Sequence, residues 1–256
     1  QLSARAGEFM HWSEDSATLH WAHGPNLYSR DLNDAFAFLE GSPKKLPEPV
    51  SKGVDLSFNK KSDRPSGLVA ITNARIITMR DAENTEEVIE NGVILIEDNR
   101  IKAIGENVQI PADAFTLDAK GKTVIPGIID GHAHGGMGMW EITPEQNWMQ
   151  MANLAFGVTT IHDPSNDTSQ IFSAAELQRS GQMLAPRIYS TGSILYGALF
   201  PALNSKISSL EDAKFHVQRL KESGAISVKS YNQQRLIGGR MRLWSSHFLF
   251  LNNTQP

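Results

Sequence analysis

The chain has 256 residues, with 24 Lys and Arg against 28 Asp and Glu, which gives a formal net charge of −4 when histidine is neutral. This near balance argues against a nucleic-acid partner or a polybasic membrane surface. Cysteine is absent, which excludes disulfides, thiolate nucleophiles and cysteine-based zinc sites. Hydrophobic residues make up 40% of the sequence, enough for a globular core, and no run approaches the roughly 18 apolar residues of a membrane span.

Residues 1–40 contain short apolar runs broken by turn residues, a pattern that predicts hairpin strands. The run from Phe9 to Asp15 reads Phe-x-x-Trp-Ser-x-Asp and resembles one blade of a TolB-type propeller. One blade cannot close a propeller, so we expect a remnant of an upstream domain, with an isolated hairpin arm as the alternative. Proline and charge dominate residues 41–66, which predicts a linker.

Two segments with different sequence patterns follow the linker. Residues 67–123 hold short apolar strands, including a predicted tight turn at Asp98-Asn99, and are expected to form a small β-layer. From residue 124 to residue 232, apolar strands alternate with helix-length stretches at 144–156, 169–180 and 209–223. Ser209 with the acids after it is typical of a helix start. This alternation predicts an α/β fold with a parallel sheet, either a barrel or doubly wound.

The most informative segment runs from Pro126 to Gly136 and reads Pro-Gly-Ile-Ile-Asp-Gly-His-Ala-His-Gly-Gly. Residues two apart on a strand point to the same side, so Asp130, His132 and His134 are expected to project together. Two imidazoles at this spacing can bind one divalent cation, at the strand end where (β/α)8 barrels keep their chemistry. The alternative is a pair of unrelated surface histidines.

Lys229 provides a second candidate ligand. Strand alternation places Ile226 and Val228 on one face and Ser227, Lys229 and Tyr231 on the other. An unpaired ammonium inside a barrel is costly, whereas a lysine carboxylated by carbon dioxide would supply oxygen ligands able to bridge two cations. The alternative for a lone strand lysine is a snorkelling side chain at a sheet edge.

Together these segments resemble the amidohydrolase superfamily, and the N-terminal blade makes the chain most similar to TolB-type propeller/amidohydrolase fusions. The resemblance covers about residues 67–232 and implies a β-sandwich followed by a partial (β/α)8 TIM barrel, about strands 1–4. It implies that His132 and His134 bind a first divalent metal, expected to be zinc, that Lys229 bridges to a second, and that all three are catalytic. A metal-activated water would then hydrolyse amide-like carbon–nitrogen bonds.

Substrate contacts are expected at the strand ends that face this site. His162 lies on the predicted second barrel strand, after Ile161, and either lines the site or packs behind it, while Asp163, Ser165 and Asn166 open the next loop. We assign His162, Asp163, Asn166 and Tyr231 as candidate substrate-binding residues. The expected substrate is a small molecule or a short peptide-like compound.

The pattern breaks after Tyr231. The family also uses histidines on strands five and six and an aspartate on strand eight, and only His247 remains among later histidines, without a strand-loop context. We therefore expect a fragment that is inactive alone, with an atypical, non-native tail at 233–256. Open strand edges predict homo-oligomers or aggregation.

Two alternatives to the metal-dependent hydrolase remain. One is a non-catalytic binding or scaffold protein, and the other is a mononuclear deaminase-like hydrolase, against which Lys229 counts. Only the resemblance to propeller-fused proteins bears on location, and it suggests an extracytoplasmic one.

Overall fold

The computed structural model describes residues 2–3, 7–33, 36, 38, 40–41, 43–80, 87–140, 142–196, 204–231 and 248–250. The chain divides into two compact units, residues 1–60 and residues 61–256, which are described separately. In the described parts, no helix combines the length and the apolar character that crossing a bilayer requires.

The first unit is a four-stranded antiparallel sheet in the order β1-β2-β3-β4. Its strands are β1 Glu8–Trp12, β2 Thr18–His23, β3 Asn26–Asp31 and β4 Val54–Asp55. Trp21 is buried and stacks on Tyr28, with ring centroids 5.7 Å apart. The hairpin strands are confirmed, but β4 lies within the predicted linker because Val54 pairs with Leu27. The propeller relationship stays a prediction.

The β-sandwich predicted for residues 67–123 appears as one five-stranded sheet, in which β9 joins the order β7-β6-β5-β8 by pairing with β5. Its strands are β5 Leu68–Ile77, β6 Val88–Glu97, β7 Arg100–Gly105, β8 Phe115–Asp118 and β9 Thr123–Val124. Ala74, Ile76 and Ile94 form its buried cluster. The predicted turn joins β6 to β7, and Asp98 takes the left-handed conformation there, with φ of 56°.

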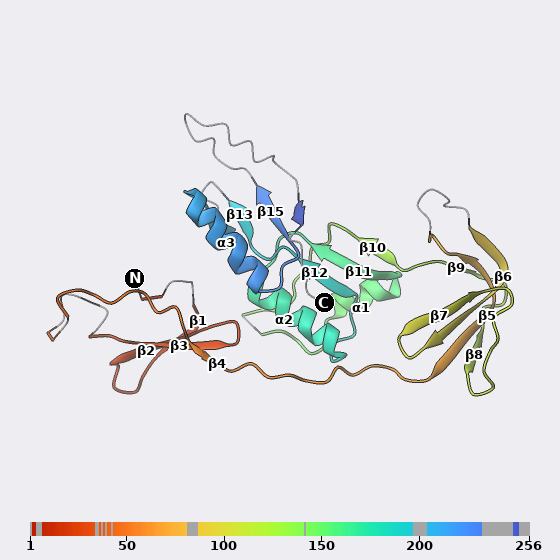
Figure 1. Cartoon of the computed structure of the whole chain (residues 1–256), viewed down its shortest axis with the longest axis horizontal. Helices are drawn as coiled ribbons and strands as arrows, with labels where there is room; N and C mark the ends of the chain where they lie inside the picture. Colours follow the sequence, from red (N-terminus) through yellow and green to blue (C-terminus); the bar gives the residue numbers. More distant parts are fainter. Residues whose placement is uncertain are drawn as a thin grey trace, which may run out of the picture. The chain divides into compact units, whose positions relative to one another are not determined.

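Parallel strands and helices make up the rest of the second unit, as the alternation predicts (Figure 1). One sheet has the order β10-β11-β12 and the other β14-β13-β15-β16, with β16 antiparallel to β15. The strands are β10 Ile128–Asp130, β11 Val158–Asp163, β12 Arg187–Ser190, β13 Ile194–Tyr196, β14 Asn204–Lys206, β15 Ser227–Tyr231 and β16 Phe248–Phe250. These elements match an α/β fold, and the partial barrel stays a prediction. Apart from β16, the tail at 233–256 lies outside the described residues.

Local capping explains where the helices begin. The helices are α1 Trp148–Ala155, α2 Thr168–Ser180 and α3 Leu210–Glu222. The predicted start of α3 is confirmed, because Ser209 and Asp212 form a reciprocal capping box that satisfies backbone N–H groups of the first turn. Helix α1 begins later than predicted, because the Asn147 side chain accepts from the Met149 N–H and sets the cap there.

Two apolar clusters hold the helices against the strands. Ile171 and Ala174 of α2 pack with Ile161 of β11 and Ile188 of β12, and Leu220 of α3 packs with the β15 residue Val228. Strand alternation then turns the neighbours of these core residues, His162 and Ser227, to the opposite face. The core therefore determines which side chains face the candidate site.

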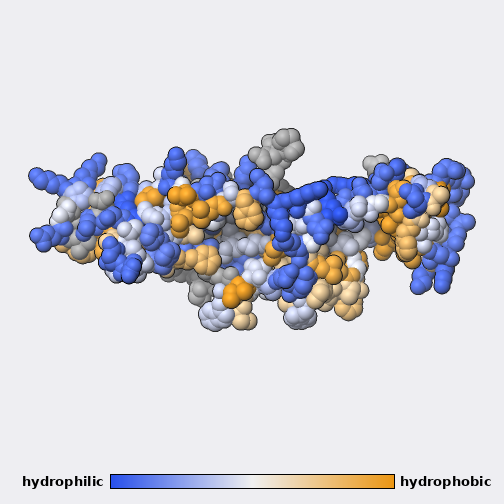
Figure 2. Space-filling view, turned by 90° about the horizontal axis from the view of Figure 1, so that it is seen from below, coloured by the Kyte–Doolittle hydropathy of each residue, from blue (hydrophilic) through white to orange (hydrophobic). Residues whose placement is uncertain are grey.

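Apolar side chains form several separate patches on the face shown in Figure 2. Among the exposed apolar residues, Ile128 and Ile129 lie on β10, the edge strand of its three-stranded sheet. The predicted open edge is thus present within the described residues. Self-association through it stays a prediction.

Gly181 is expected to be much less tolerant of alanine than Gly157. The two glycines follow α2 and α1 with nearly equal φ values of 82° and 83°, so alanine meets a similar left-handed strain at both, about 1 kcal/mol. A Cβ on Gly181 would also press against the backbone carbonyl oxygen of Asp63, whereas on Gly157 the nearest atom would lie 3.9 Å away.

Urea unfolding should show Gly181→Ala losing about 2–4 kcal/mol of unfolding free energy. Gly157→Ala is the matched control for the strain alone and should lose about 1 kcal/mol. Equal losses in the two variants would show that the contact with Asp63 carries no weight.

Candidate functional site

His132 and His134 lie next to each other just beyond the end of β10. The strand itself ends at Asp130, so the prediction that the two histidines lie on the strand is wrong. A turn follows the strand, and in it the Asp130 carboxylate accepts a hydrogen bond from the His132 N–H at 3.0 Å. Their ring centroids are nevertheless 5.1 Å apart, in an edge-to-face arrangement. The expectation that the two imidazoles share one side therefore holds.

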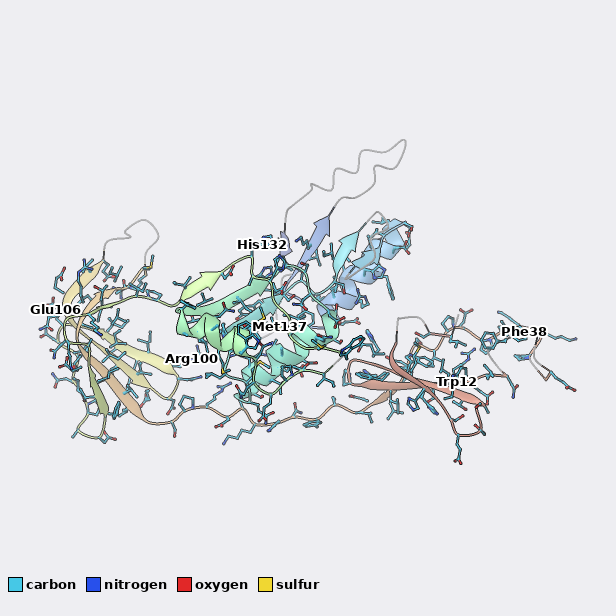
Figure 3. All side chains as sticks on the ribbon, turned by 180° about the vertical axis from the view of Figure 1, so that it is seen from behind. Trp12, Phe38, Arg100, Glu106, His132 and Met137 are labelled. Atoms are coloured by element: carbon cyan, nitrogen blue, oxygen red, sulfur yellow. The ribbon has the colours of Figure 1, made fainter. Side chains whose placement is uncertain are left out.

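Ala133, between the two histidines, anchors this segment. Its side chain is buried in the cluster with Ile161, and its N–H donates to the His162 carbonyl at 3.0 Å. Figure 3 shows His132 at the edge of this part of the molecule and Met137 among its strands and helices, where Met137 is 1% exposed. The apolar neighbours thus face the core while both imidazoles stay accessible.

A buried carboxylate lies behind His134. Asp163, at the end of β11, is fully buried, and its Oδ1 lies 3.4 Å from Nδ1 of His134. The same Oδ1 accepts from the Ser165 N–H at 2.9 Å, and Oδ2 accepts from the Asn166 side-chain amide at 2.7 Å. Asp163 therefore contacts a predicted metal ligand, and its predicted substrate contact stays a prediction.

His162 connects β11 to β15. Its Nε2 lies 2.8 Å from the Ser227 hydroxyl, which is a contact between residues 65 positions apart. Burial lowers the pKa of the His162 imidazole and the neighbouring His132 adds to this, while a hydrogen bond with the Gly131 backbone and the charge of Asp163 oppose it. The half-buried ring thus contacts β15 and the backbone just before His132, and both predicted roles of His162, lining the site or packing behind it, stay predictions.

Acidification is expected to destabilise the fold through His162. Above the ordinary imidazole pKa the ring is neutral in both the folded and the unfolded chain and contributes nothing. As the pH falls below that value, the unfolded chain takes up the proton first, because the folded-state pKa is lowered, so the free energy of unfolding decreases.

His162→Gln keeps a hydrogen-bonding group toward Ser227 but cannot titrate, so it should flatten this decrease when urea unfolding is compared at about pH 7.5 and about pH 5. Burial also lowers the pKa of His216 on α3. His216→Gln should therefore flatten the decrease further. An unchanged pH dependence in His162→Gln would contradict the assignment.

Lys229 lies on the same strand face as Ser227. Ser227 contacts His162 across the strands, while Val228 packs into the core with Leu220; alternation therefore places Lys229 on the His162 side. Its side chain is half-buried. Tyr231 ends β15, and its side chain lies outside the described residues.

The donor set partly fits a divalent cation. His132 and His134 offer two adjacent imidazoles, a common pair of zinc ligands. In the described residues, no three or more His, Asp or Glu side chains gather closely enough to hold a metal ion. The sequence assigned no function to Ser227, although strand alternation placed it on the same face as Lys229.

No protein-family model matches the chain, but curated proteins are similar to parts of it. Imidazolonepropionase of Vibrio cholerae is 38% identical over 64 residues, 25% of this chain and 16% of that protein. 5-Methylthioadenosine/S-adenosylhomocysteine deaminase of Pyrococcus furiosus is 42% identical over 69 residues, 25% and 16% of the two chains. Dihydroorotase of Geotalea daltonii is 28% identical over 165 residues, 62% and 35%. The chain thus spans about a third or less of these relatives.

Solved structures agree on the fold. The crystal structure of an amidohydrolase superposes with a TM-score of 0.52 at 19% identity, over 64% of this chain and 46% of that one. These similarities support a relationship between this chain and the amidohydrolase superfamily. At this level of identity the structural likeness speaks for the fold, and the relatives named above are hydrolytic enzymes that act on carbon–nitrogen bonds.

Proposed function

We propose that this chain carries the metal-binding part of a hydrolase that cleaves amide-like carbon–nitrogen bonds in a small-molecule or short peptide-like substrate. The observation that carries the proposal is the pair of accessible imidazoles, His132 and His134, side by side beyond the end of a parallel strand. In open and closed parallel sheets alike, active sites form beyond the carboxyl ends of the strands. We interpret the parallel strands as about the first four of a (β/α)8 barrel.

Three residues would hold the metal in this proposal. His132 and His134 would bind a first divalent cation, expected to be zinc, and Lys229, carboxylated on Nζ, would bridge to a second. Bound divalent cations would supply a water acidified toward neutral pH and an electrophile for the scissile carbonyl. The protein itself would fix the two imidazoles through the buried side chain of Ala133 and through the residues that contact the histidine segment.

Metal analysis tests the proposal. After removal of metals and dialysis against zinc, the purified chain should retain zinc in proportion to protein by elemental analysis, and His132→Ala/His134→Ala should retain none. Hydrolysis is then assayed on dipeptides, cyclic amides and other amides. Wild-type protein that keeps no more zinc than the double variant and hydrolyses none of these compounds would favour a non-catalytic binding protein instead.

A further inference from the structure

Asp163 is a buried charged residue beside one of the proposed metal ligands. Asp163 is fully buried. Burying a carboxylate is energetically costly unless hydrogen-bond donors compensate it. Two donors are in place, the Ser165 N–H at 2.9 Å and the Asn166 amide at 2.7 Å. The remaining polar neighbour is Nδ1 of His134, 3.4 Å from Oδ1.

Asn166 connects this carboxylate to the backbone of the histidine segment. Its side-chain nitrogen donates both to Asp163 and to the Gly135 carbonyl at 2.8 Å, and its side-chain oxygen accepts from the Asp167 N–H at 2.8 Å. Both amide protons are therefore in use. Together the two side chains contact the ring of His134 and the residue that follows it.

The chemistry of these contacts determines where the His134 proton lies. An ionised carboxylate can only accept hydrogen bonds, so a proton on Nδ1 of His134 would face Asp163 and leave the Nε2 lone pair available to a metal. Ser165 is the competing neighbour, with its hydroxyl 3.5 Å from the same Nδ1. Both separations, 3.5 Å to Ser165 and 3.4 Å to Asp163, are longer than ordinary hydrogen bonds, so length does not choose between the two neighbours. Charge does, because the carboxylate attracts the ring proton and can only accept, whereas the hydroxyl is neutral and can also donate.

We propose that Asp163, held by Asn166, is a positioning residue for His134: it keeps the proton on Nδ1 and orients Nε2 for the metal. This role replaces the predicted substrate contacts of Asp163 and Asn166. It rests on the proposed function, because it assigns the residues behind one of the ligands of that site. Outer partners of this kind typically change metal affinity 10–100-fold when removed.

The test uses Asp163→Asn, which preserves shape but removes the charge and offers an amide donor. Ser165→Ala is the matched control, because it removes the competing hydroxyl from the same ring nitrogen and leaves the carboxylate. Zinc affinity is measured by competition with a chromophoric chelator. We expect binding about 10–100-fold weaker in Asp163→Asn, and within about threefold of wild type in Ser165→Ala.

The proton position is read directly in the metal-free protein. Long-range nitrogen-15 NMR distinguishes the two neutral imidazole tautomers, and comparison with His134→Gln assigns the signal. Wild type and Ser165→Ala should carry the proton on Nδ1, and Asp163→Asn should shift it toward Nε2. A proton on Nε2 in wild type would overturn the proposal even if Asp163→Asn does not fold, as would an unshifted tautomer or unchanged zinc affinity in that variant.

These readouts separate the two proposals. If wild type binds no zinc but its His134 proton lies on Nδ1 and moves in Asp163→Asn, the proposed function fails and the positioning of the ring stands. If zinc binds but the tautomer does not depend on Asp163, only the positioning role fails.

Discussion

Lys229→Ala is expected to lower the bound zinc from about two equivalents to about one. In the proposed site Lys229 supplies the only ligand from β15, and it lies on the strand face that contacts His162 through Ser227. His132 and His134 remain in the variant, so the first cation should stay. Elemental analysis of protein dialysed against zinc measures the stoichiometry.

Lys102→Ala is the control for this experiment. Lys102 lies on β7, exposed and paired with Glu97, so its removal should leave the zinc content unchanged. Adding bicarbonate to carbonate-depleted wild type should restore the second equivalent, because the proposed ligand forms from carbon dioxide. Equal zinc content in Lys229→Ala and wild type would remove the bridging role, and about one equivalent in both would favour a mononuclear site.

Local sequence signals predicted the features that depend on neighbouring residues. Ser209 and Asp212 specify the start of α3 within four positions. Strand alternation predicted that the two imidazoles lie together, and they do, but beyond the end of β10 rather than on it. The turn between β6 and β7 is also placed correctly, because it too depends on neighbouring residues. In that turn Asp98 rather than Asn99 takes positive φ, which both residue types tolerate.

Long-range contacts determine what the sequence could not show. Asp163 and Asn166 were predicted to touch substrate because they open a loop after a strand. Asn166 lies in that loop, whereas Asp163 is the last residue of β11. Their burial depends on Gly135 and His134, about 30 residues earlier in the chain. No local pattern reports such a contact. The contact between His162 and Ser227, 65 residues apart, could not be predicted from sequence periodicity for the same reason.

Apolar packing beneath the site should dominate the stability of this region. Ile161 is 1% exposed, belongs to the same cluster as Ala133, and precedes His162 and Asp163 on β11. Ile161→Ala removes buried carbons and leaves a cavity in a cluster shared by strands and α2, so we expect a loss of about 2–5 kcal/mol in the free energy of unfolding.

Ile129→Ala is the matched control for the packing prediction, because Ile129 lies on the neighbouring strand and is 70% exposed; its loss should stay within about 0.5 kcal/mol. Urea unfolding followed by circular dichroism compares the two variants. Ile161→Ala should also weaken zinc binding, because the strand it loosens carries Asp163 behind the His134 ring. Similar unfolding free energies for both variants would show that this cluster does not support the strands that carry the site.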